Sequence, residues 1–313
     1  MDFTLSEEQQ ELAGLVRTIA TDRLTQERLK QVETESAHFD RELWRALADA
    51  GVLGAALPET VGGGGLDFLE LCSVLIELGR TVAPLPYLAS TVSAAALAYF
   101  GTDDQRARWA TPAAAGELIL TAALTEDLND DPERPTTRAQ RTDSGWQLTG
   151  TKAVVPFATV ADAFLVPATT AEGVKLFLVL PADSGVRLEA QRIVDGDTEA
   201  TIELAGAQLG DDRLVPGADA VHWLVARTTV GLCALQLGVI ERALELTAAY
   251  ARERQQFGRP IGSFQAVAQR LADGYIDVEA ARLTLWEAAW RIASGLPAAT
   301  EIATAKFWAA DAG

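Results

Sequence analysis

The chain has 313 residues, of which 49% are hydrophobic and 22% charged, so it can bury the cores of two or three domains and is too apolar for wholesale disorder. Its formal charge of −18, from 26 Lys and Arg against 44 Asp and Glu, disfavours nucleic-acid binding, which rests on many Lys and Arg contacts to phosphates. A small anionic ligand is not excluded, because a single well-placed arginine decides that.

The first part of the sequence has the pattern of a helical domain, which we place at residues 1–117. Ser6 and Gln9 form a capping-box signature, and Asp40 is the predicted N-cap of a second helix that ends at Gly51. Apolar residues at helical spacing predict further helices at 69–78, 89–100 and 103–110.

A run of glycines, Gly62 to Gly65, follows the second helix. A phosphate-binding loop would need a strand before the glycines and a Lys-Ser or Lys-Thr pair after them, and neither is evident. We therefore interpret this stretch as a flexible loop between helices.

From about Leu118 the sequence pattern changes to short apolar or β-branched runs separated by turn residues, which is typical of strands. We expect a β-domain at residues 118–216, with its prolines between strands rather than within them. The segment from Thr142 to Gly145 is a predicted hairpin turn. The predicted strands cover residues 119–124, 136–141, 145–149, 163–166, 174–180 and 198–204.

Residues 217–313 return to helical spacing, with two long helices and a third around 300–310. Between the long helices, Gly258, Pro260 and Gly262 interrupt the pattern. The interrupted segment carries one guanidinium that matters here, because Arg254 can bind phosphate oxygens through two parallel hydrogen bonds, which suits a nucleotide diphosphate. The alternative is an ordinary helix–helix corner with basic residues near a helix C-terminus, and spacing alone favours that alternative.

Cysteines and histidines are too few to indicate metal or nucleophile chemistry. Cys72 and Cys233 lie among apolar residues and are expected to be buried free thiols. His38 and His222 are the only histidines, so we expect neither a zinc site nor a histidine-activated nucleophile. The N-terminus lacks signal-peptide features and no run reaches about 18 apolar residues, so we expect a cytoplasmic protein without a membrane span.

The pattern R-x-Q-F-G-x-P-I-x-x-F-Q from Arg254 to Gln265 resembles the flavin-contacting turn of the acyl-CoA dehydrogenase family. Further marks of that family follow one another in the N-terminal half: Leu5 to Gln10, Trp44 through Gly51 to Pro58–Glu59, the Gly62 to Gly65 loop, and Gly101 through Gln105 and Trp109 to Glu117. The resemblance spans essentially the whole chain. It implies a multi-domain α+β fold with an N-terminal all-α domain, a middle β-domain and a C-terminal helical bundle.

The resemblance implies FAD as cofactor and an acyl-CoA thioester as substrate. In the family, FAD lies between the β-domain and the helical bundle, and the turn reaches the FAD of a neighbouring subunit. That role falls by position to Arg254, Phe257 and Gln265. Thr125 matches the residue that ends the first β-domain strand and meets the flavin, although an ordinary strand-end residue explains it equally well.

The implied reaction is α,β-desaturation, in which a glutamate takes the α-proton while the β-hydrogen leaves as hydride to the flavin. Electron transfer flavoprotein is the implied electron acceptor. The implied assembly is a tetramer, formed either by this chain alone or with another family member.

Two departures from the family pattern lie in the β-domain. After Glu126 the family has small residues, whereas this chain has the acidic stretch Asp127 to Pro132, whose carboxylates would repel a CoA diphosphate. After Lys152 the family has a Trp-Ile-Thr or Trp-Ile-Ser strand, whereas this chain has Ala-Val-Val-Pro156, without an aromatic ring, a hydroxyl or, at the proline, an N–H.

A third departure is that the catalytic glutamate is not found. In one branch of the family its position corresponds to Thr228, beside Thr229 where an Arg often stands. In the other branch it lies well beyond residue 313, past a second glycine motif that is also absent. We assign Glu241 and Glu245, which are turns away from Thr228, to a solvated helix face.

Two hypotheses remain, and the two departures in the β-domain favour the one given first. In one, the chain is a non-catalytic partner subunit of a heteromeric dehydrogenase for steroid or other bulky acyl-CoAs, and it lends its turn to a catalytic partner. In the other, it is a complete dehydrogenase whose base lies in a C-terminal segment missing from this sequence, so that the bundle at 217–313 is incomplete. Different flavin chemistry, such as oxygenation, is a weaker third hypothesis.

Overall fold

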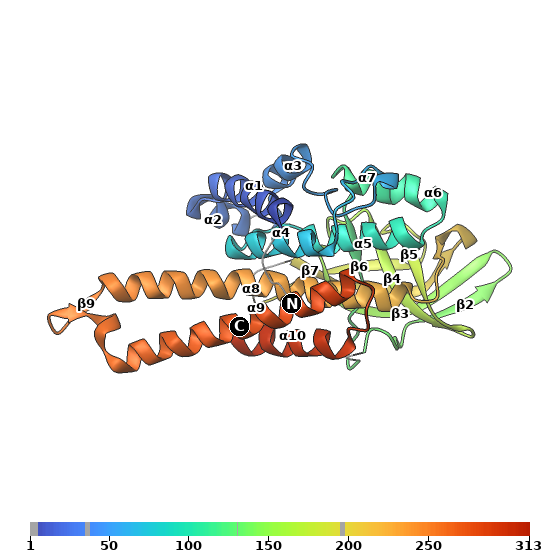
Figure 1. Cartoon of the computed structure of the whole chain (residues 1–313). Coiled ribbons are helices and arrows are strands. Elements are labelled where there is room, and N and C mark those ends of the chain that lie inside the picture. Colours follow the sequence, from blue (N-terminus) through green and yellow to red (C-terminus); the bar gives the residue numbers. More distant parts are fainter. Residues whose placement is uncertain (1–5, 35–37, 130, 195–197) are drawn as a thin grey trace. The chain divides into compact units, whose positions relative to one another are not determined.

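The structure is a computed structural model that describes residues 6–34, 38–129, 131–194 and 198–313 (Figure 1). It has N-terminal helices, a central β-sheet and C-terminal helices, so the predicted fold class is confirmed. The chain forms two compact units: Met1–Leu24, Asp67–Ala83 and Thr229–Gly313 make the first, and Thr25–Leu66 and Pro84–Thr228 make the second. This division does not follow the domain boundaries at 117 and 216, which stay a prediction.

The first unit consists of helices. The capping box is confirmed at the start of its first helix, where the Ser6 hydroxyl accepts a hydrogen bond from the Gln9 amide (3.1 Å) and the Gln9 side chain accepts one from the Ser6 amide (2.9 Å). The helices are α1 (Glu7–Arg23), α4 (Phe68–Arg80), the part of α8 (Ala220–Glu253) from Thr229 onward, α9 (Gln265–Ala293) and α10 (Ala299–Ala312).

Within this unit, α8 and α9 lie antiparallel and form an arm that ends in a small hairpin (Figure 1). At the base of the arm, α4 and α8 approach so closely that a Cβ atom on Gly79 would clash with the carbonyl oxygen of Leu235, and one on Gly238 with that of Ile76. The two glycines therefore allow backbone-to-backbone packing of these helices.

The α8 helix is, among the described residues, the one helix long and apolar enough to cross a membrane by length and composition alone. Half of its most apolar stretch is buried by the rest of the protein, including Val230, Ala234 and Leu237. Burial of this kind identifies α8 as a core helix.

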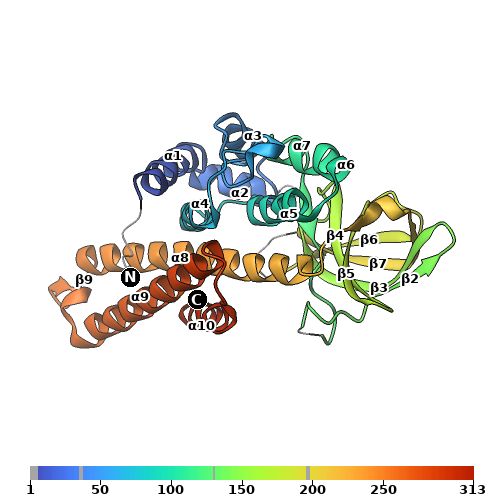
Figure 2. The same ribbon diagram turned by 45° about the vertical axis from the view of Figure 1, so that its right-hand side comes forward.

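The second unit combines helices with a β-sheet (Figure 2). Asp40 caps α3 as predicted, accepting hydrogen bonds from the amides of Glu42 and Leu43 (both 3.0 Å). The helix predicted at 103–110 continues to Ala114 and contains one π turn. The helical elements are α2 (Gln26–Thr34), α3 (Arg41–Asp49), a 3₁₀ turn (Glu59–Val61), α5 (Tyr87–Phe100), α6 (Asp103–Gln105), the π turn (Arg106–Ala110) and α7 (Thr111–Ala114).

The sheet of this unit has strand order β6-β7-β3-β2-β4-β5-β8, with β1 paired to β4. The predicted hairpin turn is confirmed, because Thr142 pairs with Gly145 across it. The strands are β1 (Leu120–Ala122), β2 (Arg138–Thr142), β3 (Gly145–Pro156), β4 (Ala163–Thr170), β5 (Gly173–Val179), β6 (Val186–Arg192), β7 (Thr198–Leu209) and β8 (Leu214–Val215).

Several expectations about this unit were wrong. The strand from Gly145 was predicted to end at Thr149 but runs on to Pro156, because pairing with β7 continues past the glycine at 150. Prolines were expected between strands, yet Pro156 ends β3 and Pro167 lies inside β4. Pro167 pairs with Leu176 of β5 on one side. On the other side β1 pairs only with residues 163–165 and β2 only with Thr169, so no strand on that side is paired with Pro167, which makes the missing N–H tolerable there.

The glycine loop is packed rather than flexible. The Gly64 amide donates to the Gly54 carbonyl (3.0 Å) and the Gly65 amide to the Leu57 carbonyl (2.9 Å). A Cβ on Gly63 would clash with the Leu57 carbonyl. The glycines therefore allow the loop to pack directly against the backbone of residues 54–57, so the expectation of a flexible connection was wrong.

Gly79→Ala and Gly238→Ala are expected to destabilise the protein by about 2 kcal/mol or more, because each new methyl group forces α4 and α8 apart. Urea denaturation measures the change in the free energy of unfolding. The matched control is Gly14→Ala in α1, where a Cβ meets nothing within 4 Å, so the exchange should stabilise by roughly 0.5–1 kcal/mol. Equal effects at all three positions would contradict the close packing.

Candidate functional site

The segment from Arg254 to Gln265 contains a hairpin with a two-residue turn at the end of the α8–α9 arm. β9 (Gln255–Gln256) pairs antiparallel with β10 (Arg259–Pro260), which leaves Phe257 and Gly258 as the turn. Their φ angles are +52° and +77°, so both residues are left-handed, as a type I′ turn requires. Glycine adopts this conformation freely, whereas a phenylalanine there is strained.

Backbone hydrogen bonds connect the hairpin to the end of α8 and close its two sides on each other. The Arg254 amide donates to the Tyr250 carbonyl at the end of α8, and the Ile261 amide donates to the Arg254 carbonyl (both 2.8 Å). Phe257 is 93% exposed despite its size. An exposed aromatic ring on a strained, hydrogen-bonded backbone makes this hairpin a candidate binding surface.

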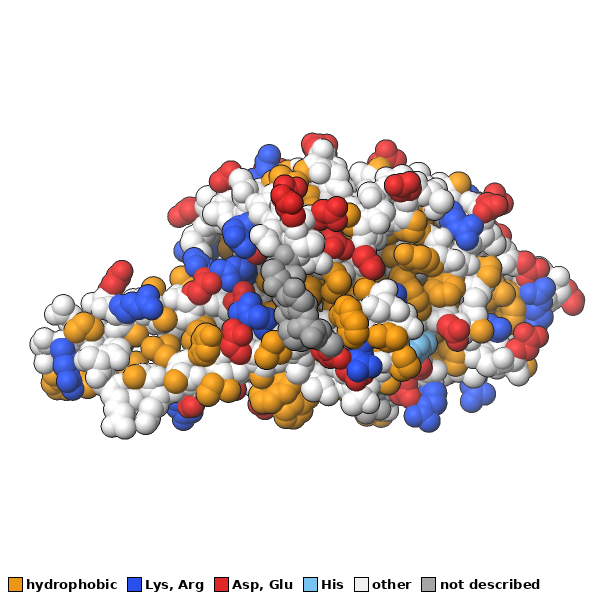
Figure 3. Space-filling view, in the orientation of Figure 1, with side chains coloured by type: hydrophobic (Ala, Val, Ile, Leu, Met, Phe, Trp, Pro, Cys, Tyr) orange, Lys and Arg blue, Asp and Glu red, His pale blue; other side chains and the backbone are white. Residues whose placement is uncertain are grey.

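The charges and apolar side chains near the hairpin support that interpretation. Arg254 is exposed and forms no ion pair within the described part of the chain, and Gln265 is exposed at the first position of α9. Along the arm, large apolar side chains are also open to solvent, and Figure 3 shows hydrophobic and basic side chains at its free end. These exposed side chains are Leu246, Tyr250, Tyr275, Ile276 and Leu283.

A hollow of about 520 Å³ lies between the end of α8 and the start of α9, within the first unit. Its walls are mostly alanines together with Pro260 and Leu271, and Arg252 and Ser263 are the polar residues of its lining. The structure therefore places Arg254, Phe257 and Gln265 in one exposed segment beside a shallow concave surface.

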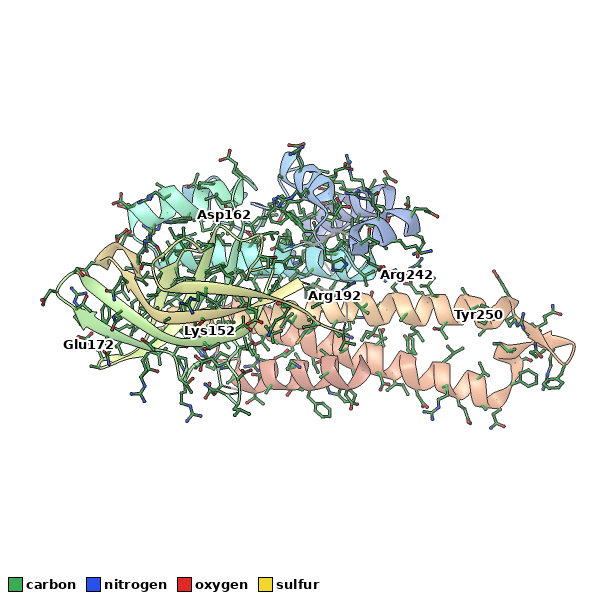
Figure 4. The ribbon with its side chains drawn as sticks, turned by 180° about the vertical axis from the view of Figure 1, so that it is seen from behind. Lys152, Asp162, Glu172, Arg192, Arg242 and Tyr250 are labelled. Atoms are coloured by element: carbon green, nitrogen blue, oxygen red, sulfur yellow. The ribbon has the colours of Figure 1, made fainter. Side chains whose placement is uncertain are left out.

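In the second unit, the residues around Thr125 form a different kind of site. Thr125 is exposed, and its carbonyl accepts a hydrogen bond from the Ala153 amide (3.0 Å). Glu126 points the other way and is buried, where Lys152 donates to it at 2.7 Å. Lys152 is fully buried within the sheet (Figure 4).

The two threonines that directly precede β2 bind the Glu126 carboxylate. The amide and hydroxyl of Thr136 donate to one carboxylate oxygen (both 2.6 Å), and the amide and hydroxyl of Thr137 donate to the other (3.0 and 2.6 Å). Burial alone would raise the pKa of Glu126, but the hydrogen bonds from Lys152, Thr136 and Thr137 outweigh it and hold that pKa far below its usual range. Because its pKa is depressed and both carboxylate oxygens accept hydrogen bonds, Glu126 is a structural anchor rather than a free base.

The acidic loop after Glu126 is ordered by its own polar groups. The Asn129 side chain donates to Glu126 (3.2 Å) and to the Arg134 carbonyl (3.0 Å), and Arg134 pairs with Asp131 (2.6 Å). Leu128 is fully exposed with φ +59°. The side chains here are acidic or bulky where close approach of a ligand to backbone N–H groups needs small ones.

The strand beyond Lys152 is irregular. A register shift against β7 separates Lys152 from Val155, and Val154 inside it has φ +50°. A β-branched residue in the left-handed region is an outlier that marks a β-bulge. With Pro156 beyond it, this strand offers no hydroxyl or ring of the kind expected beside a flavin.

No carboxylate occupies the expected base position, since Thr228 and Thr229 are half-buried neutral residues on α8. The assignment of Glu241 to a solvated face was wrong. Its side chain is 11% exposed and pairs with Arg80 (2.9 Å) and Arg282 (2.6 Å), and burial raises its pKa. Glu245 is about half exposed and pairs with the same Arg80 (2.7 Å).

Both cysteines are buried free thiols, as predicted. In the described residues, no group of three or more His, Cys, Asp or Glu side chains is placed to hold a metal ion. His222 is exposed and contacts Glu133 at 2.9 Å.

Comparisons with known proteins fit this geometry. Residues 6–117 match the acyl-CoA dehydrogenase N-terminal domain and residues 216–313 the acyl-CoA dehydrogenase C-terminal domain. Acyl-CoA dehydrogenase FadE27 of Mycobacterium tuberculosis is 47% identical over 100% of this chain and 85% of its own length. The chain belongs to the acyl-CoA dehydrogenase family. It is an enzyme of the flavoprotein oxidoreductase class that this family represents.

Solved structures agree with the family assignment. The ChsE4–ChsE5 complex from Mycobacterium tuberculosis contains a chain that is 47% identical, with TM-score 0.96 and coverage of 100% of this chain and 85% of that one. The Tcur3481–Tcur3483 steroid ACAD contains one that is 42% identical, with TM-score 0.94 and coverage of 99% and 84%. Members of the acyl-CoA dehydrogenase family bind FAD, as the FAD complex of PigA illustrates.

Sequence reasoning missed the buried Glu126–Lys152 pair. Both residues stand in stretches that carry the family resemblance, but they lie 26 positions apart and only the sheet brings them together. The signal available was that Lys152 is followed directly by the apolar run Ala153 to Val155, because a lysine buried among such residues needs a carboxylate partner.

Lys152→Met is expected to destabilise the protein by roughly 3–5 kcal/mol, because it leaves the Glu126 carboxylate buried without its counter-charge. The double variant Glu126→Gln/Lys152→Met should cost less than the sum of the two single variants. Urea denaturation of all four proteins gives the coupling free energy. Additive effects would contradict a direct buried pair.

The same pair predicts a dependence of stability on pH. Because the folded-state pKa of Glu126 is depressed, its contribution is present above the pKa of an unfolded glutamate, about 4.3, and is lost as pH falls below that value. The free energy of unfolding should therefore fall less steeply with acid in Glu126→Gln than in the unmodified protein. Identical slopes between pH 3 and 6 would count against the depressed pKa.

Proposed function

We propose that this chain is a subunit of a heteromeric, FAD-dependent acyl-CoA dehydrogenase that desaturates a steroid-derived or similarly bulky acyl-CoA. The observation that carries the proposal is the arm-tip hairpin, which presents an unpaired Arg254 and a 93% exposed Phe257. The similar chains in the ChsE4–ChsE5 complex and in the Tcur3481–Tcur3483 steroid ACAD, each of which pairs two different proteins, support it.

At the hairpin, the residues fit the phosphate and ring parts of FAD. Arg254 would bind the pyrophosphate of a cofactor in the neighbouring subunit, because its planar guanidinium forms two parallel hydrogen bonds to phosphate oxygens. Phe257 would cover an apolar part of the cofactor, and Gln265 would donate or accept one hydrogen bond beside it. The apolar flanks of the arm support its burial against another subunit.

The β-domain of this chain fits the flavin ring poorly. Its loop carries Asp127 and the fully exposed Leu128, and β3 contains the Val154 bulge and Pro156. Thr125, at the end of the first strand, is exposed and is a residue of the type expected beside a flavin. We infer that the complete FAD site belongs to the partner, and that this chain lends the arm tip to it.

The desaturation requires a base that removes the proton at the α-carbon of the thioester. Thr228 cannot serve, because an unactivated hydroxyl is not basic at neutral pH, and Glu241 is engaged by two arginines. In the proposed complex the partner subunit supplies the base, and bound FAD would supply the hydride acceptor. Electron transfer flavoprotein is the proposed electron acceptor, and the cytoplasm is the proposed location.

The proposal is tested by expression of the chain alone and with a family member that carries a glutamate at the base position. The chain alone should lack the visible absorbance of FAD, whereas the pair should bind FAD and oxidise an acyl-CoA with an artificial electron acceptor. Flavin and turnover from this chain without a partner would reject the partner-subunit role. A version extended past residue 313 that is active alone would favour the complete-dehydrogenase hypothesis.

Arg254→Ala is expected to weaken FAD retention in the assembled complex by about 10- to 100-fold, the loss of hydrogen bonds to a charged group. The free energy of unfolding of the isolated chain should change by less than about 0.5 kcal/mol, because Arg254 is exposed and unpaired. Arg270→Ala, which removes an 88% exposed guanidinium from the same arm, is the matched control. FAD occupancy unaffected by Arg254→Ala would contradict the role assigned to the hairpin.

A further inference from the structure

The helix that follows the hairpin begins without a side-chain cap. The N-cap residue of α9 is Phe264, with φ −82° and ψ 131°, and no side chain accepts a hydrogen bond from the first turn. Ser, Thr, Asp and Asn are preferred at this position because their side-chain oxygens accept a hydrogen bond from a free amide of the first turn. A phenylalanine gives up that stabilisation, so its ring serves another purpose.

The ring of Phe264 contacts both the turn of the hairpin and the strand that follows it. Phe257 meets it edge to face, with ring centroids 6.2 Å apart and an interplanar angle of 89°. Arg259, on β10, places its guanidinium carbon 4.3 Å from the centroid of the same ring. One aromatic face thus connects a residue of the turn with a cation of the strand that leaves it.

Phe257 depends on these contacts for its orientation. Its side chain is 93% exposed, and Phe264 is the one aromatic ring that it contacts among the described residues. An exposed side chain without such a neighbour exchanges freely between rotamers. Arg259, in turn, has no ion pair among the described residues, so its guanidinium is available to the ring.

We propose that Phe264 and Arg259 are positioning residues, which hold the Phe257 ring in the geometry that binds the partner's FAD. This inference rests on the proposed function and deepens it. The cost of an uncapped α9 is offset by a binding surface whose aromatic ring is oriented before the cofactor arrives.

Phe264→Asn separates this role from a purely structural one. The new side chain caps α9, so the thermal midpoint of the isolated chain should stay the same or rise. FAD retention of the co-expressed complex, followed by visible absorbance after dialysis, should fall by about two- to tenfold because Phe257 loses its support. A variant that retains FAD like the unmodified complex would overturn the proposal.

Arg259 gives an independent measurement from an exposed position that does not affect folding of the core. Arg259→Gln should weaken FAD retention by about two- to fivefold, the strength of an exposed cation–π contact, and Arg259→Lys should fall between it and the unmodified protein. Arg270→Gln removes an equal charge from the same arm and should have no such effect. If Arg259→Gln and Arg270→Gln weaken retention equally, charge alone explains the result and the positioning role is wrong.

The two levels of the proposal fail in different ways. If Arg254→Ala lowers FAD retention while Phe264→Asn and Arg259→Gln do not, the positioning role falls and the proposed function stands. If Arg254→Ala also leaves retention unchanged, the proposed function fails together with the inference built on it.

Discussion

The arrangement at the arm tip depends on one backbone constraint, namely that two successive residues between α8 and α9 adopt left-handed conformations. Such a turn reverses the chain within two residues and matches the twist of the short strands on either side. It places Phe257 at the apex, and the hydrogen bond from Ile261 to Arg254 closes the loop behind it. The strain at Phe257 is tolerated because both ends of the loop are fixed to long helices.

The base of the arm is fixed by a cluster of charged side chains in the first unit. Arg80 on α4 contacts Glu241 and Glu245 on α8, and Arg282 on α9 contacts Glu241 from the other side. The close helix packing at Gly79 and Gly238 lies on the same two helices, α4 and α8. These ion pairs and the close helix packing fix the base of the two-helix arm, which helps its exposed end to keep a defined geometry.

The sequence predicted much of this fold because its signals were local. The capping box at Ser6, the Asp40 cap and the hairpin at Thr142 to Gly145 are each set by residues within a few positions of one another. Errors arose where distant residues decide. The packed glycine loop depends on the carbonyls of residues 54–57, and the tolerated Pro167 depends on where two neighbouring strands end.

For the candidate site, the family motif identified the hairpin residues but could not indicate how they are held. The burial of Glu241 and the pairing of Glu126 with Lys152 depend on contacts across 161 and 26 positions, which no periodicity records. The strands β9 and β10 were missed because two residues each are too short for a pattern. These strands form because Phe257 and Gly258 both adopt left-handed conformations, and the amino-acid composition of the segment does not reveal this.

The tied hairpin has a thermodynamic consequence for assembly. A loop that must order on contact loses backbone entropy of about 1–2 kcal/mol for each residue fixed, which subtracts from the affinity. In this chain the ordering has already taken place during folding, so little of that penalty is left for the docking step. In the proposed complex, the arm end would therefore meet the neighbouring subunit as a preorganised surface.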